Sequence, residues 1–386
     1  GAAALGRIQV EPIGQLVAPA YRPFFGPRTA LQAAALVRTE GGIDLTGLKL
    51  SGGQLSLDGS LSTTSDGFLD RLDLSALVAD PNGSVVLLPV PGEATSIQSG
   101  RLRVDFGGDG QDANQDWHAD LTAEGFSNGS IAARTLTIAA TGVAANLGDP
   151  ANRRLTFNAD GSLGGISSQD KDVTAALGDS AGFGLAGLWA AGGPVQIAEL
   201  RLVGKALTMA LAGAVDDWSF DGRIGLETSS IAPFSGLAGR PLQGALSLAA
   251  TGTVAPLTGG FDLTLDGAAD NLALAEPTLD RVLAGRVALA GRVARTAEGI
   301  TAEGFRLGND KVELRADGSF ATGNADFAFA VDLTDLALLS DEAQGRLEIR
   351  GSATGQGIIA LDLTGRVPQG RLAGKALTDA QFGFAG

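Results

Sequence analysis

The chain has no cysteine among its 386 residues, which excludes disulfide bonds, thiolate metal sites and cysteine nucleophiles. This absence does not decide the compartment, because an oxidising environment permits disulfides without requiring them. The chain has one histidine, His118, and a single histidine cannot form a metal cluster. We interpret His118 as a residue of a strand or loop and expect no metal site around it.

Long apolar runs are also missing. No stretch approaches about 18 consecutive apolar residues, the length that predicts a transmembrane helix. The first residues carry no basic region of a signal peptide, and the last six, 381–386, read like an interrupted strand. We interpret the chain as the middle portion of a longer protein, with any membrane anchor in a segment outside it.

Positive charge is scarce, because 28 Lys and Arg against 43 Asp and Glu give a formal net charge of −15. A surface of this sign repels phosphate backbones, so nucleic acid is not an expected partner. It also disfavours flat docking on an anionic membrane.

Glycine and short alternating runs are what the sequence does have. Gly accounts for 57 residues, and apolar residues account for 44%. Apolar and polar residues alternate in many short runs, such as 55–58, 102–106 and 261–266. A period of two places the apolar side chains of a strand on one face. We predict an all-β fold: an elongated, curled antiparallel sheet, or β-taco, with a few short helices such as 277–284.

Two glycine patterns predict turns. Asp-Gly pairs occur at 58–59, 66–67, 160–161, 221–222, 266–267 and 317–318, and each is a turn candidate. A Gly-Arg-aliphatic motif recurs eight times, as at 100–102 and 291–293. We interpret it as a turn glycine, an outward arginine and the first inward residue of a strand. The Gly- and Ala-rich region 178–195 predicts a loop or a boundary between halves.

Longer self-similarity indicates stacked repeats. The run 122–126 (TAEGF) returns at 301–305, and residues 47–74 match 304–333 with a short insertion. Repeated strand–turn–strand units favour stacking over closed globular domains. We expect two continuous β-taco segments, 1–190 and 191–386.

Three motifs offer weak hints of chemistry, and none meets its structural requirements. The segment 125–129 fits G-x-S-x-G around Ser127, but His118 precedes the serine, whereas a hydrolase of that fold has its histidine after it. The segment 182–187 fits G-x-G-x-x-G without a βαβ pattern. Residues 107–112 fit a single calcium-binding nonapeptide unit, which needs tandem copies, and Asp112, Asn114 and Asp116 resemble the start of an EF-hand loop, but Trp117 occupies its glycine position and Ala123 that of its acid. We predict no enzyme and no cofactor, interpret 109–116 as an acidic hairpin loop, and expect Trp117, Trp189 and Trp218 to pack.

The alternating strands leave an apolar face that needs a cover. Because helices are few, we expect the sheet to curl into a trough whose aliphatic lining suits acyl chains, each CH₂ of which gains about 0.8 kcal/mol on leaving water. The predicted lipid-groove residues are Leu55, Leu57, Leu102, Val104, Leu246, Leu248, Leu263, Leu265, Val312, Leu314, Leu347, Ile349, Leu361 and Leu363.

One stretch, from Ile231 to Gly244, is distinctive, and it is accompanied by shorter segments at 261–263, 279–285 and 331–336 and by an N-terminal stretch from 10 to 26. In these segments the chain resembles the TamB (translocation and assembly module) family of the AsmA-like group. The resemblance covers most of the chain and lies in repeat style. It implies a periplasmic β-taco that is tethered to the inner membrane and moves phospholipid towards the outer membrane. The family's outer-membrane assembly machinery would be met through a C-terminal region outside this chain.

A second hypothesis is a secreted structural β-solenoid or adhesin passenger, which would also be rich in glycine and free of cysteine. Solenoids favour regular coils of about 20–30 residues. The spacing here is irregular, and long hairpins dominate.

Overall fold

The computed structural model of the chain describes residues 3–5, 19, 22–26, 29–90, 94–107, 114–129, 131–169, 171–236 and 238–386. The chain divides into two compact units, Gly1–Lys205 and Ala206–Gly386. Strands make up 68% of the structure and helices 7%, which confirms the all-β prediction. Most of the calcium-like segment, residues 108–113, falls outside the described residues.

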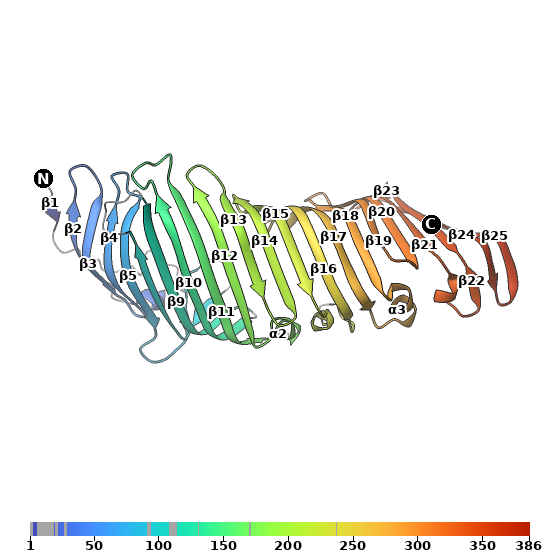
Figure 1. Cartoon of the computed structure of the whole chain (residues 1–386), viewed down its shortest axis with the longest axis horizontal. Helices are drawn as coiled ribbons and strands as arrows, with labels where there is room; N and C mark the ends of the chain where they lie inside the picture. The colour runs from blue at the N-terminus through green and yellow to red at the C-terminus, as the bar shows by residue number, and fades with distance from the viewer. Residues whose placement is uncertain are drawn as a thin grey trace. The chain divides into compact units, whose positions relative to one another are not determined.

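Unit 1 is built from β1 to β13 and two short helices, shown from blue to green in Figure 1. Its elements are β1 (Ala3–Leu5), α1 (Arg22–Phe25), β2 (Ala30–Val37), β3 (Ile43–Ser51), β4 (Leu55–Thr63), β5 (Leu69–Ala79), β6 (Val86–Leu87), β7 (Thr95–Ile97), β8 (Ser99–Phe106), β9 (Asn114–Asn128), β10 (Ile131–Ala145), β11 (Arg154–Ser168), α2 (Lys171–Leu177), β12 (Ser180–Ala190) and β13 (Val195–Val203).

Unit 2 runs from yellow-green to red in Figure 1 and has one short α-helix and two 3₁₀ turns. Its elements are β14 (Leu207–Asp216), β15 (Ser219–Thr228), η3 (Ala232–Phe234), β16 (Gln243–Ala255), β17 (Gly260–Ala273), α3 (Pro277–Leu283), β18 (Arg286–Arg295), β19 (Ile300–Gly308), β20 (Val312–Ala321), β21 (Asn324–Leu333), η4 (Leu336–Leu338), β22 (Ala343–Gly345), β23 (Leu347–Gln356), β24 (Ala360–Leu372) and β25 (Lys375–Ala385).

Within each unit, strands that follow one another along the chain pair antiparallel, with two detours. In unit 1, β5 pairs with β8, while the β6–β7 hairpin attaches to β9. In unit 2, β21 pairs with β23, while the short β22 pairs with β24. Among the described residues the sheet does not close on itself, and all the strands belong to this one sheet, so no second sheet packs on its apolar face.

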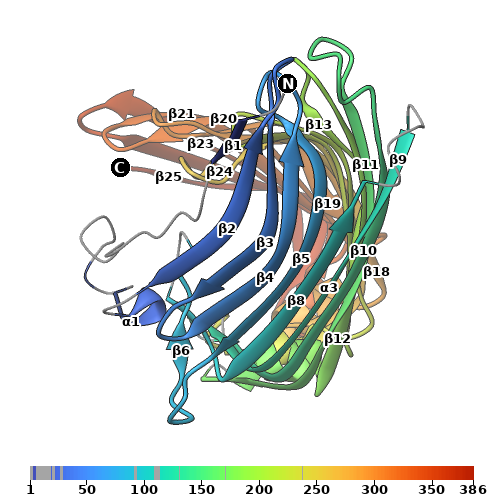
Figure 2. The ribbon, with the colours of Figure 1, turned by 90° about the vertical axis from the view of Figure 1, so that its left-hand side faces the viewer.

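The long strands bend along their length, as Figure 2 shows for β2 to β5 and β8 to β12 of unit 1. Strand β11 shows the two faces clearly. Leu155, Phe157 and Leu163 are half-buried, whereas Thr156 and Asn158 are exposed. We call the face that carries the half-buried apolar residues the inner face and the opposite one the outer face.

Helices and short hairpins cover the inner face only at strand ends. In unit 1, Phe24 of α1 and Val86 of β6 pack against Ile97 and Ala123. Leu177 of α2 packs against the cluster of Ala133, Ile166 and Ala181. In unit 2, Val282 of α3 and Leu336 of η4 pack with Leu333, Leu347 and Val367. These elements supply local cores, because an open sheet has no continuous core of its own.

Several local predictions were right and several were wrong. Helix α3 is confirmed: Glu276 caps it by accepting a hydrogen bond from the Leu279 N–H at 2.8 Å, and Pro277 stands at its first turn. The predicted loop at 178–195 is instead mostly strand β12. The structure places the division between units after Lys205. Helix α2 was not predicted.

The Asp-Gly turn prediction was wrong at five of its six positions. Gly67 alone lies in a turn, with φ of 85°. Gly59, Gly161, Gly222, Gly267 and Gly318 lie inside strands. In each of these pairs the aspartate faces outward and the glycine faces inward, because they obey the same alternation as every other strand residue.

Candidate functional site: the inner apolar face

The inner face of unit 1 carries a continuous row of apolar and glycine positions joined by strand register. The pairing runs through ten strands, and each residue lies opposite the next. The row is Leu31, Leu50, Leu57, Ala76, Leu102, Leu121, Ile138, Gly161, Phe183 and Leu202. We call it the central row of unit 1. At about 4.8 Å per strand it spans roughly 43 Å.

Unit 2 has an equivalent row across eleven strands. It consists of Met209, Leu226, Leu248, Gly267, Leu289, Leu307, Leu314, Val331, Ile349, Gly365 and Phe382. This central row of unit 2 spans roughly 48 Å at the same strand spacing. No charged side chain interrupts either row.

All fourteen predicted groove residues lie on the inner face of their unit. Leu57 and Leu102 lie in the central row of unit 1, with Leu55 and Val104 on the same face of their strands. In unit 2, Leu248, Leu314 and Ile349 lie in the central row. The other seven occupy the inner face beside that row: Leu246, Leu263, Leu265, Val312, Leu347, Leu361 and Leu363.

The middle of the inner face stays partly exposed. Leu57, Leu102, Leu121 and Ile138 are half-buried although they stand at the centre of their strands. Among the residues that the structure describes, no helix lies over this middle part, since the covering elements pack at the strand ends. The arrangement therefore offers a long apolar strip with no side chain able to do acid–base or nucleophilic chemistry.

Sequence reasoning missed part of this strip. Gly161, which is opposite Phe183 in β12, lies so close that an added Cβ would stand 2.1 Å from the phenylalanine ring. The same arrangement joins Phe157 to Gly187, Phe329 to Gly351 and Phe382 to Gly365. A ring laid over a cross-strand glycine fills the gap left by the missing side chain. The signal that could have revealed this part of the strip is a phenylalanine that alternates with glycine and alanine, as in β12. In the sequence alone, that composition indicates a loop.

A strap covers the inner face of unit 1 near one set of strand ends. It is the β4–β5 turn, residues 64–68, and it reaches the β10–β11 loop. Arg153 is 7% exposed, donates to Asp66 at 2.6 Å and to the Leu147 carbonyl at 2.8 Å, and lies 4.3 Å from the Phe68 ring centre. Phe68 in turn stacks on Trp189 at 6.3 Å. The guanidinium and the Thr64 hydroxyl hold the pKa of the Asp66 carboxyl well below its usual range.

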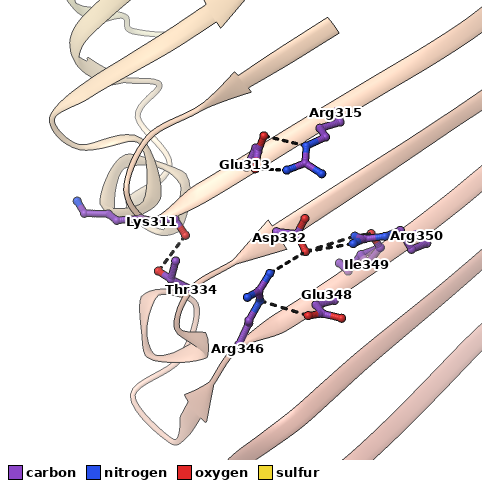
Figure 3. A network of polar contacts seen from close by, with 9 residues as sticks. All are labelled: Lys311, Glu313, Arg315, Asp332, Thr334, Arg346, Glu348, Ile349 and Arg350. Atoms are coloured by element: carbon purple, nitrogen blue, oxygen red, sulfur yellow. Dashed lines mark hydrogen bonds and ion pairs between the residues drawn. The ribbon is translucent and has the colours of Figure 1, made fainter. Parts of the chain in front are cut away.

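The outer face is a polar surface with paired charges. Figure 3 shows Asp332 of β21 between Arg346 and Arg350, at 3.6 and 3.3 Å, with Arg346 also 3.3 Å from Glu348. Asp332 lies opposite both Glu313 and Glu348 in the sheet, so these arginines offset a like-charge repulsion. Arg315 also donates a hydrogen bond to Glu313, at 2.8 Å, and this bond lowers the pKa of the Glu313 carboxyl.

A second charge group on the outer face joins three strands. Arg292 of β18 donates to both oxygens of Asp262 at 2.7 and 2.6 Å and to Glu303 at 3.0 Å. The Arg292 hydrogen bond lowers the pKa of Asp262. The three side chains are 42% to 66% exposed, so the group contributes little to stability.

The structure does not assemble the weak chemical motifs into sites. Ser127 lies within strand β9, opposite Ser96 and Ala132, without the strand–turn–helix of a nucleophile elbow. His118 is exposed on the outer face of β9. Residues 182–187 lie within β12, where Gly182 and Gly184 floor a shallow hollow of about 360 Å³ that also contacts Asp160 and Arg201. In the described ranges, no three His, Asp or Glu side chains gather closely enough to hold a metal ion.

The tryptophans differ in their surroundings. Trp189 stacks on Phe68, and the Trp117 indole donates to the Thr156 carbonyl at 3.1 Å. Both therefore pack as expected. Trp218 lies in the β14–β15 turn and is 72% exposed, so the packing prediction was wrong for it.

Comparison of the chain with protein-family models, with curated proteins and with solved structures finds no match. No helix in the described part of the chain is both long and apolar enough to cross a membrane. The fold and the inner face therefore carry the functional argument.

Proposed function

We propose that this protein carries phospholipid along its inner face, with the acyl chains on the apolar strip and the head group in water. The observation that carries the proposal is the central row of each unit, which is apolar or glycine at every position across ten and eleven strands. Many sheets have strands with one apolar face. A row of apolar residues that crosses every strand without interruption is the feature that would let an acyl chain slide from strand to strand.

Length and energetics agree with this occupant. One leaflet of a bilayer is about 15 Å of hydrocarbon, half of the roughly 30 Å core, so each row exceeds an acyl chain several-fold. Burial of each CH₂ gains about 0.8 kcal/mol. Because each row is apolar or glycine at every position, a chain would meet no charged or polar side chain along it, so that short displacements along the row would cost little.

The resemblance to the TamB family supplies the proposed setting. We place the protein in the periplasm, tethered to the inner membrane through a segment outside this chain, with outer-membrane biogenesis as the process it serves. The antiparallel pairing differs from the parallel coils of a β-helix, which favours the conduit over a solenoid passenger. No residue is assigned a catalytic role.

Photo-crosslinking at matched inner and outer positions tests the proposal. A crosslinking residue at Leu248, Leu263 or Leu314 should capture phospholipid from cell envelopes, whereas one at the adjacent outer positions Ser247, Thr264 and Arg315 should not. Each pair shares a strand and a depth along it, so only the face differs. Equal capture on both faces, or none on either, would refute lipid carriage on the inner face.

A substitution series gives an independent reading. Leu263→Asp and Leu314→Asp should reduce lipid capture at neighbouring inner positions, because a carboxylate on the strip makes acyl contact costly. The matched variant Thr264→Asp places the same carboxylate on the outer face and should leave capture unchanged. Circular dichroism of each variant checks that the sheet is intact.

A further inference from the structure

We propose that one edge of unit 2 is a membrane-docking rim that inserts into a zwitterionic phospholipid surface. Five large apolar side chains there are more than half exposed: Trp218 72%, Leu257 76%, Ile300 52%, Phe320 54% and Ile358 88%. Exposed apolar residues scattered singly are normal on proteins. These five are not scattered.

Topology places all five at the same ends of the strands. They lie in, or next to, the turns that join β14 to β15, β16 to β17, β18 to β19, β20 to β21 and β23 to β24. Each of these turns ends one strand and starts its antiparallel neighbour, so all five turns fall on one edge of the sheet. Two direct contacts support this: Gly357 donates to the Gly323 carbonyl at 2.7 Å, and Ile300 pairs with Phe320.

The opposite strand ends of unit 2 have a different character. They carry η3, α3, η4 and β22, and the apolar residues of α3 and η4 pack inward on Leu333, Leu347 and Val367. Three large apolar residues at those ends, Leu279, Leu339 and Leu372, are 42%, 39% and 52% exposed, so they are fewer and on average less exposed than the five of the rim.

Hairpin turns in this protein do not need exposed apolar residues to form. In unit 1, the turns at 64–67, 146–153 and 191–194 expose Ser65, Asp66, Asn146 and Asp149, and the one large aliphatic side chain among them, Leu147, is 8% exposed. Polar turns are the norm, so five apolar tips on one edge call for a partner that accepts them.

The spacing favours a lipid surface over a protein partner. Successive turns of the rim are separated by two strands, roughly 10 Å, and by polar residues such as Thr258 and Asn324, although Ile300 and Phe320 lie directly opposite each other on neighbouring strands. Protein interfaces bury a contiguous, densely packed centre. Separate apolar side chains can each enter between lipid head groups, and tryptophan is enriched at that depth.

The charged residues near the rim indicate which class of lipid it should bind. The turns beside the rim carry Asp216, Asp217 and Glu298 against Arg295 alone. This local excess of negative charge gives no attraction to anionic lipid. The rim should therefore bind zwitterionic vesicles, with little response to added salt. This inference stands independently of lipid carriage on the inner face.

Vesicle flotation of the full chain tests the rim. The purified chain should float with phosphatidylcholine vesicles, and the triple variant Trp218→Ser, Leu257→Ser, Ile358→Ser should bind at least about tenfold more weakly. The control Val85→Ser removes a 62% exposed apolar side chain in unit 1 and should bind like the parent. Adding anionic lipid should not strengthen binding.

Trp218 fluorescence supplies a second readout. Subtracting the emission spectrum of the Trp218→Phe variant from that of the parent gives the emission of Trp218 alone. This emission should shift to shorter wavelength when vesicles are added, because the indole leaves water. Failure of the parent to float, equal flotation of the triple variant, or an unshifted Trp218 emission would overturn the proposal. So would self-association by sedimentation that the triple variant abolishes without any effect on vesicle binding, since the rim would then be a protein interface.

Discussion

At the scale of single residues, the inner glycines let neighbouring backbones approach closely. Gly213, Gly222 and Gly252 lie opposite one another across β14, β15 and β16. A Cβ added at Gly222 would stand 2.3 Å from the Ala212 carbonyl oxygen, and one at Gly252 would stand 2.0 Å from that of Asp262. Glycine inside a strand marks such close approaches and the bends that go with them.

Gly222→Ala should therefore destabilise unit 2 by more than about 1 kcal/mol, because the new methyl group meets fixed backbone. Gly225→Ala is the matched control in the same strand. A Cβ there meets its nearest atom, the Ala210 carbonyl oxygen, at 3.9 Å, so the change should be neutral or stabilising by about 0.5 kcal/mol. Urea unfolding measures both variants, and equal midpoints would contradict this account of the inner glycines.

At the scale of elements, the strap of unit 1 depends on one ionised carboxylate. Asp66 has a lowered pKa because Arg153 and then Thr64 hydrogen-bond to its carboxylate. A group whose pKa is lower in the folded state stabilises that state above its unfolded pKa, here about 3.9, and loses this contribution as pH falls. Acid should therefore release the strap before it unfolds the strands beneath.

Asp66→Asn tests this dependence. At pH 7 the variant should unfold at lower urea concentration than the parent, and the difference should shrink as pH falls below about 4. Trp189 fluorescence follows the strap, because Phe68 stacks on that indole. Asp149→Asn is the control, since its carboxylate contacts Asn152 instead of Arg153. A difference that stays constant down to pH 3 would contradict the role given to the Asp66 carboxylate.

Elements whose signals are local could be predicted, and those built by distant contacts could not. The alternation at 55–58 and 312–315 placed Leu57 and Leu314 on the inner face, and the short run that begins at Pro277 predicted α3. Strand β12 was missed because its sequence is rich in Gly and Ala, while its contacts with β11, Phe183 over Gly161 and Phe157 over Gly187, join residues distant in sequence. The strap joins Asp66 to Arg153, 87 residues apart, so no sequence window contains it.

At the scale of the whole molecule, each unit is an array in which a strand is stabilised mainly by its two neighbours. Local cores such as the Val282 cluster add to this at the strand ends. Arrays with nearest-neighbour stabilisation unfold by segments, because losing one strand removes support only from those beside it. A closed core would instead transmit the loss throughout a domain.

Native-state hydrogen exchange should reveal this segmental behaviour. In the Gly222→Ala variant, amides of β14 to β16 should exchange faster, while those of β23 to β25 in the same unit should keep the protection of the parent. Both groups of strands belong to unit 2, so independent unfolding of the two units cannot produce the difference. A uniform loss of protection across unit 2 would show that its strands unfold as one cooperative body. Because the middle of the inner face is already open between the covered strand ends, the proposed lipid carriage needs no unfolding of strands, and the exchange experiment tests the array alone.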